Sequence, residues 1–204
     1  MAALEFGTGI WAFGQFVDRY AADGYGPPRS TRDMIETAAK VPDLSCLDIN
    51  VPFATDGLSA QEVKTLLDDN GLTCRATTPH IYMREYVKGA FTNPSADLRR
   101  RVQARVDEAV EAAAVLEAGY VKFWPGQDGY DFPGQVDYLQ IWDRTIDGMR
   151  DICQRHPDVQ FAIEYKPREP RVRMTLANAP KTLLAIQETG VDNLGIVMDF
   201  GHSL

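Results

Sequence analysis

The stretch VQFAIEYK, residues 159–166, is apolar at its centre and ends in a carboxylate and an ammonium. A short apolar run of this kind is typical of a buried strand in a parallel sheet. Glu164 stands near its end, where parallel α/β enzymes present catalytic or metal-binding groups. The stretch NLGIVMDF, residues 193–200, repeats the pattern and brings Asp199 to the end of a second strand. The two stretches together predict an α/β fold with its chemistry at the strand ends.

Strand-like and helix-like segments alternate along the whole chain, which predicts parallel strands joined by right-handed crossovers. The sheet is then either an open doubly wound sheet or a barrel. The Ser59–Glu62 pattern predicts a capping box, and Asn93-Pro94 predicts the start of the longest helix. We predict strands at 4–13, 46–53, 72–79, 120–124, 159–165 and 193–200, and helices at 31–41, 59–71, 93–117, 137–155 and up to Gly190.

The glycine pattern after the first strand disfavours a nucleotide-binding fold. GTGIWAFG has its glycines at 7, 9 and 14, which is the wrong spacing for a dinucleotide fingerprint, and no phosphate-binding loop occurs anywhere. The long loops with polar and aromatic residues follow the strands rather than the helices. This favours a barrel whose active face lies at the carboxyl ends of its strands.

Composition indicates an ordinary globular protein of one domain: 204 residues, 45% hydrophobic and 25% charged. The net charge of −8 argues against nucleic acid as a partner. The dense basic run, Arg99–Arg101 with Arg105, lies in a predicted helix and is interpreted as a solvated helix face. No membrane-spanning stretch or signal peptide is evident, so we expect a cytoplasmic protein without membrane contact. Three cysteines without C-x-x-C spacing indicate neither a disulfide framework nor a zinc knuckle.

Four residues at the last two strand ends are the candidates for chemistry: Glu164, Lys166, Asp199 and His202. A buried carboxylate needs a cation or a hydrogen-bonding partner, so Glu164 is either a metal ligand or one half of a salt bridge to a nearby Lys or Arg. Asp199 is alternatively a helix cap, and His202 a loop histidine. Oxygen ligands favour Mg²⁺ or Mn²⁺, and a histidine shifts the preference toward Mn²⁺ or Co²⁺.

Aromatic and polar groups after other strands suit sugar recognition. The loop from Trp124 to Tyr130 joins an aromatic wall to the amide of Gln127 and the carboxylate of Asp128; the alternative is a loop held by its own turns. Further candidates for substrate binding or proton transfer, each also explicable as packing when judged alone, are Trp11, Phe13 and His80. Arg168 is a candidate for substrate binding and, alternatively, one of the possible salt-bridge partners of Glu164.

These segments resemble the xylose isomerase-like TIM barrel superfamily of sugar isomerases and epimerases. The matching motifs are GTGIWAFG, Trp-Pro-Gly-Gln-Asp-Gly-Tyr, Glu-Tyr-Lys and Met-Asp-Phe-Gly-His. The resemblance implies that Glu164 and Asp199 are metal ligands and that Lys166 contacts a substrate oxygen. It also implies that His202 approaches the substrate or a second metal. It implies a TIM (β/α)8-type barrel with about six βα units present in residues 1–204 and the last two absent, so that a histidine and an acidic ligand are missing.

Three functions follow as alternatives. The first is a divalent-metal isomerase or epimerase of an unphosphorylated sugar, with Mn²⁺ preferred. The second is a lyase, similar to the catalytic subunit of C-glycoside deglycosidases, acting on 3-oxo-glycosides with a small partner subunit; the base would be His80 or His202. The third is an inactive, truncated barrel that binds a protein partner. Homo-oligomers, or a second subunit, are expected because open sheet edges favour association.

Overall fold

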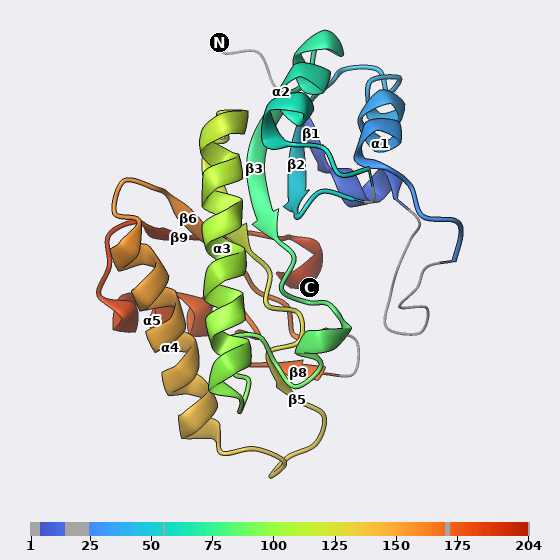
Figure 1. The fold of residues 1–204 in the computed structure, drawn as a ribbon. Coiled ribbons are helices and arrows are strands. Elements are labelled where there is room, and N and C mark those ends of the chain that lie inside the picture. Colours follow the sequence, from blue (N-terminus) through green and yellow to red (C-terminus); the bar gives the residue numbers. More distant parts are fainter. Residues whose placement is uncertain (1–4, 15–24, 55, 170–171, 204) are drawn as a thin grey trace. The chain divides into compact units, whose positions relative to one another are not determined.

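The computed structural model describes residues 5–14, 25–54, 56–169 and 172–203 (Figure 1). The chain divides into two compact units, Met1–Thr78 with Glu108–Tyr120, and Pro79–Asp107 with Val121–Leu204. The prediction of one domain therefore stays a prediction.

The first unit is built on three neighbouring strands in the order β1, β2, β3. β1 and β2 run parallel, with Gly7 beside Cys46 and Gly9 beside Asp48. Fully buried apolar side chains from α1, α2 and β2, such as Ile35, Leu47 and Leu67, form its core. The elements are β1 (Phe6–Gly9), η1 (Ile10–Phe13), α1 (Thr31–Ala38), β2 (Leu44–Val51), α2 (Ala60–Asp69) and β3 (Thr73–Pro79).

The second unit contains the parallel strands β4, β6 and β9, adjacent in that order, and a small antiparallel sheet β5-β8-β7. α4 and α5 pack on each other (Figure 1). The rings of Phe91 and Phe161 both contact Phe123, at centroid distances of 5.7 and 5.2 Å. The elements are η2 (Arg84–Tyr86), β4 (Tyr120–Phe123), β5 (Gly129–Tyr130), α4 (Tyr138–Arg155), β6 (Phe161–Glu164), β7 (Arg168–Glu169), β8 (Val172–Met174), α5 (Ala179–Thr189), β9 (Leu194–Val197) and η3 (Gly201–Ser203).

Helix termini follow the local signals in the sequence. Ser59 and Glu62 form the predicted capping box at α2, and Asp137 caps α4. Gly190 ends α5 in the left-handed conformation, with φ of 67°. These ends are decided by residues three or four positions apart, which is why the sequence pattern locates them well.

Several element boundaries differ from the sequence prediction, most clearly those of the first strand and the longest helix. The first strand ends at Gly9, because the chain turns into η1 and Gly14 donates a backbone hydrogen bond to Trp11. Leu4, the predicted first residue of that strand, lies outside the described residues. The longest helix is α3 (Ala96–Leu116); Ser95 Oγ accepts from the backbone N–H of Leu98, whereas the Asn93 amide braces the preceding loop by donating to Gly89 O.

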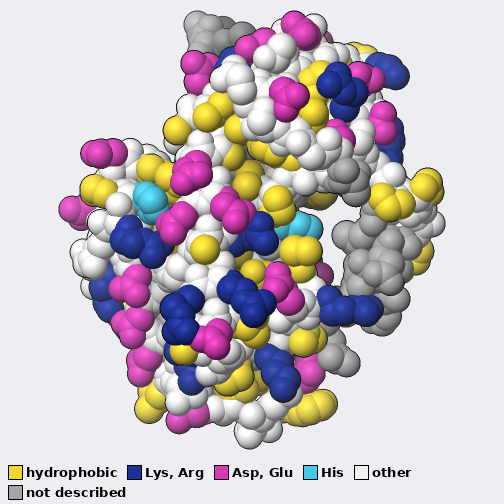
Figure 2. Space-filling model, in the orientation of Figure 1, with side chains coloured by type: hydrophobic (Ala, Val, Ile, Leu, Met, Phe, Trp, Pro, Cys, Tyr) yellow, Lys and Arg dark blue, Asp and Glu magenta, His cyan; other side chains and the backbone are white. Residues whose placement is uncertain are grey.

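The basic run lies on α3, as predicted, among carboxylates. Arg100 pairs with Asp97, and Arg101 lies 3.6 Å from Glu85. Figure 2 shows cationic and anionic side chains interspersed over the visible face of α3 and α4. Of the helices that the structure describes, none is both long enough and apolar enough to cross a membrane.

Candidate functional site

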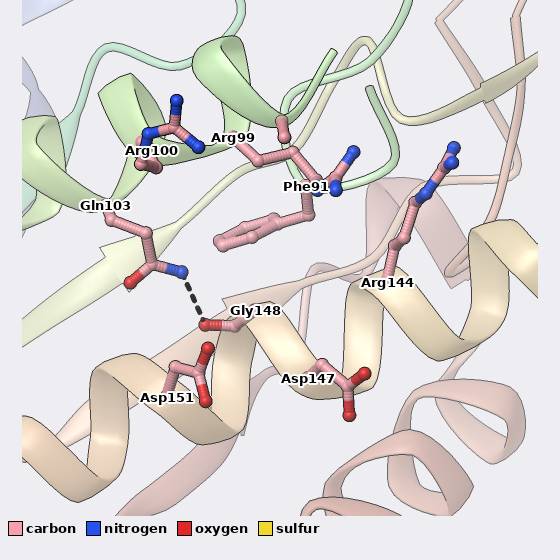
Figure 3. A pocket seen from close by; sticks show the side chains of 9 residues that line it. Phe91, Arg99, Arg100, Gln103, Arg144, Asp147, Gly148 and Asp151 are labelled. Carbon is pink, nitrogen blue, oxygen red and sulfur yellow. Dashed lines mark hydrogen bonds between the residues drawn. The ribbon is translucent and has the colours of Figure 1, made fainter. Parts of the chain in front are cut away.

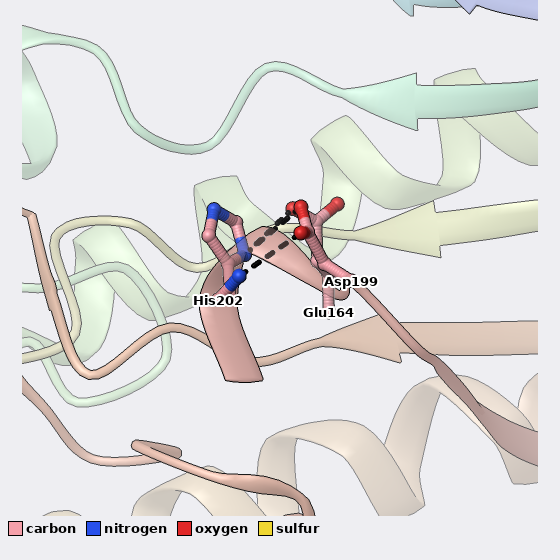
Figure 4. Close-up of side chains that lie close together, drawn as sticks. All are labelled: Glu164, Asp199 and His202. Atoms are coloured by element: carbon pink, nitrogen blue, oxygen red, sulfur yellow. Dashed lines mark hydrogen bonds and ion pairs between the residues drawn. The ribbon is translucent and has the colours of Figure 1, made fainter. Parts of the chain in front are cut away.

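The ends of β6 and β9 bring three candidate residues together. Glu164 is the last residue of β6, and its register partner in β9 is Val197. Asp199 follows two residues beyond Val197, just after β9 ends, and so lies at the same end of the paired strands as Glu164. One ligand atom each from Glu164, Asp199 and His202 lies within 4.8 Å of the others (Figure 4). This placement is the juxtaposition that the sequence predicted for the two carboxylates.

The imidazole of His202 is turned toward three oxygen acceptors. Its Nδ1 lies 2.9 Å from the backbone oxygen of Tyr165, 3.2 Å from Asp199 Oδ2 and 3.4 Å from Glu164 Oε1. A carbonyl oxygen only accepts hydrogen bonds, so Nδ1 carries a proton in this arrangement. A neutral ring with its proton on Nδ1 would offer the lone pair of Nε2 to an incoming proton.

The turn that carries His202 is fixed by its own backbone and side chains. Asp199 Oδ1 accepts from the backbone N–H of His202 at 3.0 Å, and Ser203 Oγ donates to the Asp199 carbonyl at 2.7 Å. Asp199 thus braces the turn with Oδ1 while Oδ2 faces the imidazole. The two alternatives for Asp199 in the sequence, a cap and a metal ligand, are therefore compatible, because they would use different oxygens.

Glu164 has a cationic partner that the sequence analysis did not identify. Lys122 on β4 places Nζ 3.2 Å from Glu164 Oε2, and the two side chains are only 9% and 13% exposed. Lys166, in contrast, pairs with Glu169 and lies over the Trp124 ring at 5.7 Å from its centroid. The sequence does contain a signal for the partner of Glu164, because Lys122 stands inside the otherwise apolar strand YVKF.

Aromatic side chains form a continuous group in the second unit. Trp124 meets Tyr82 edge-on at 4.6 Å, and Tyr82 contacts His80 at 4.3 Å. Gln127 Nε2 donates to the Tyr82 carbonyl at 3.2 Å, which ties the predicted loop to this group. Burial and the nearby charge of Arg105 lower the pKa of His80 to about 4, so its ring is neutral at pH 7. Tyr82 is an addition to the predicted aromatic wall.

The remaining candidates lie elsewhere. Asp128 is buried, and its Oδ1 accepts from the backbone and hydroxyl of Thr92, both at 2.6 Å. Arg168 is exposed on β7. Trp11 and Phe13 belong to η1 of the first unit, where Phe13 packs on the core and the Trp11 ring covers Gly9. Their roles in substrate binding stay predictions.

A separate cavity of about 340 Å³ lies between α3 and α4 (Figure 3). Gln103 reaches across it to the Gly148 carbonyl at 3.1 Å, and Arg99 and Arg144 donate to the backbone of the Thr92–Pro94 loop. None of the candidate site residues lines this cavity. It is a groove between packed helices rather than part of the strand-end cluster.

The three ligand atoms fit a divalent cation by their chemistry. Two carboxylates and one imidazole are a donor set typical of Mn²⁺, Co²⁺ or Zn²⁺, and three protein ligands leave coordination positions open for a substrate. All three residues are partly buried. The imidazole nitrogen that faces both carboxylates is His202 Nδ1, so a cation held by all three residues would take the place of the proton that Nδ1 shares with the Tyr165 carbonyl.

Comparisons with known proteins identify the fold. Solved structures that resemble the chain include a family 2 AP endonuclease from Brucella melitensis, with 13% identity, a TM-score of 0.70, and coverage of 98% of this chain and 69% of that one. A D-psicose 3-epimerase from Clostridium cellulolyticum H10, solved with D-tagatose, has 17% identity, a TM-score of 0.65 and coverage of 95% and 62%. The IOLI protein, solved with a zinc atom, has 13% identity, a TM-score of 0.66 and coverage of 98% and 64%.

This chain therefore spans about 60–69% of the length of these three structures and of a similar L-ribulose 3-epimerase. The α/β fold of TIM-barrel type predicted from the sequence is confirmed. The family described as xylose isomerase-like TIM barrel matches residues 33–204, which is most of the chain. The chain belongs to the xylose isomerase-like TIM barrel family.

Proposed function

We propose that the protein is a divalent-metal-dependent isomerase or epimerase of an unphosphorylated sugar. The observation that carries the proposal is the convergence of Glu164, Asp199 and His202 at the carboxyl ends of β6 and β9. Membership of the family supports it, and epimerases occur among the solved structures with this fold. The strand-end position is where enzymes with this architecture bind their substrates.

Glu164 and Asp199 would hold the cation, with Mn²⁺ preferred and Mg²⁺ or Co²⁺ as alternatives. A bound divalent cation would polarise adjacent sugar oxygens and so ease the movement of hydrogen between neighbouring carbons. The neutral tautomer of His202 would present Nε2 as a proton acceptor, because Nδ1–H is held by the Tyr165 carbonyl.

Lys166 would donate a hydrogen bond to a sugar oxygen. Its ammonium is held by Glu169 beside the Trp124 ring, so it would meet a sugar that lies against this aromatic face. Tyr82 and Trp124 would supply the apolar contact surface that sugar rings favour. Gln127 would contribute an amide to the hydroxyl groups. With its lowered pKa, His80 would act as a neutral hydrogen-bonding group or a weak base rather than as a cation.

The test is a panel of free pentoses and hexoses, as aldoses and ketoses, incubated with full-length protein stripped of metal and then supplied with Mn²⁺. We expect conversion of at least one sugar, loss with chelator and loss in Glu164→Gln. Glu111→Gln, an exposed carboxylate on α3, is the matched control and should behave as the wild type. Absence of any metal-dependent conversion would refute the proposal, and release of an aglycone from a 3-oxo-glycoside without sugar conversion would replace it with the lyase.

A further inference from the structure

Lys122 is buried in the middle of β4. Its strand neighbours Val121 and Phe123 are fully buried, and its own side chain is 9% exposed. An ammonium in such a setting is strongly unfavourable unless a negative charge stands close to it. A lysine at this position therefore needs a specific partner.

One such partner is an oxygen of the candidate metal ligand Glu164. β4 and β6 are parallel with Lys122 beside Ala162, and Glu164 lies two residues further on the same face. Lys122 Nζ lies 3.2 Å from Oε2, whereas Oε1 of the same carboxylate faces His202. The two oxygens of Glu164 are thus divided between an internal cation and the cluster with Asp199.

We propose that Lys122 is a positioning residue of the candidate metal centre, a built-in counter-cation that holds Oε2 of Glu164 and leaves Oε1 for a bound metal. The inference rests on the proposed function, since it assigns Glu164 to a metal. Lys122 holds the carboxylate in one orientation when no metal is present. The consequence is that the site is formed before the metal binds, at the expense of metal affinity.

Removing Lys122 has two opposing effects on metal affinity, and their relative sizes decide whether the affinity rises or falls. Loss of the ammonium frees the rotamers of one glutamate, which weakens metal binding slightly. It also removes a positive charge beside a divalent cation in a partly buried site, and like-charge repulsion at such short range is the larger effect. Lys122→Met should therefore bind metal more tightly than the wild type.

Calorimetric titration of the full-length, chelator-stripped protein with Mn²⁺ measures the metal affinity of the wild type and of each variant. We expect the dissociation constant to fall about tenfold or more in Lys122→Met, and to stay near the wild-type value in Lys122→Arg, which keeps the charge. Lys64→Met removes a lysine that pairs with Asp68 on α2 and is the matched control, with unchanged affinity. Equal or weaker Mn²⁺ binding by Lys122→Met would overturn the inference.

Unfolding in EDTA provides a second measurement that does not depend on metal. In a double-mutant cycle with Glu164→Gln, we expect the effect of Lys122→Met to be smaller once Glu164 has lost its charge. If Lys122→Met does not fold in EDTA, a folded double variant supports the pairing and an unfolded one overturns it. Additive effects of the two substitutions would refute the role of Lys122 and leave the proposed function standing. A wild type that binds no Mn²⁺ would instead refute the proposed function.

Discussion

Replacement of Asp128 by Asn should stabilise the protein at neutral pH. Asp128 is 2% exposed, and its Oδ1 accepts two hydrogen bonds from Thr92, while Oδ2 is buried beside the backbone of Ala90 and Phe91. Burial raises the pKa of Asp128 from an ordinary 3.8 to about 6, against the opposing effect of hydrogen bonds from Thr92 and from the backbone of Ala90 and Phe91. Asn keeps the Oδ1 acceptor and removes the charge.

The direction in which stability changes with pH follows from the number of protons that the folded and unfolded states bind. Between pH 3.8 and 6 the folded state binds more protons at Asp128 than the unfolded state, so stability falls as pH rises through this window. The difference of about 2 pH units corresponds to roughly 3 kcal/mol, at 1.36 kcal/mol per unit. The advantage of Asp128→Asn in the free energy of unfolding should thus be about 1 kcal/mol at pH 4.5 and rise to about 3 kcal/mol at pH 8.

Urea unfolding of the wild type and the variant, followed by tryptophan fluorescence from pH 4.5 to 8, measures the difference. Other titrating groups are common to both proteins and cancel. Asp158→Asn removes an exposed carboxylate and should show no such pH dependence. An advantage that stays flat or decreases as pH rises would show that the carboxyl of Asp128 does not titrate as its burial requires.

Two further substitutions test the fold by urea unfolding. Ser59→Ala removes the side chain of the α2 capping box and should cost about 1 kcal/mol; an unchanged midpoint would contradict the cap. Phe161→Ala removes the ring stacked on Phe123 and should cost about 3–5 kcal/mol. Phe132→Ala, which removes an exposed ring, should change stability by less than about 0.5 kcal/mol and is its control.

Local signals and long-range contacts explain how well the fold could be predicted. The caps at Ser59, Asp137 and Gly190 depend on residues within one turn, and the sequence pattern locates them. The length of β1 depends on where its pairing with β2 stops, and the sequence overestimated it. The short strands β5, β7 and β8 pair across a loop and carry too few residues to show alternation.

In the candidate site, too, the features that depend on local signals could be predicted and those that depend on long-range contacts could not. Glu164 and Asp199 could be predicted because each ends an apolar run, and parallel strands bring such ends together. His202 follows Asp199 closely enough that one turn joins them. Tyr82 could not be predicted as part of the aromatic group, since its contact with Trp124 joins segments far apart in the chain.

The lysine beside Glu164 is the clearest case. If β6 continued past Glu164, alternation along the strand would place Lys166, two residues away, on the same side as Glu164. β6 ends at Glu164, however, and the chain then turns toward β7, so that Lys166 meets Glu169 and Trp124. The cation that reaches Glu164 comes from β4, where register with β6 places Lys122 on the same face of the sheet. Strand register, not spacing along the chain, decides which charge a strand-end carboxylate meets, and so which lysine would tune a metal at the site proposed for Glu164.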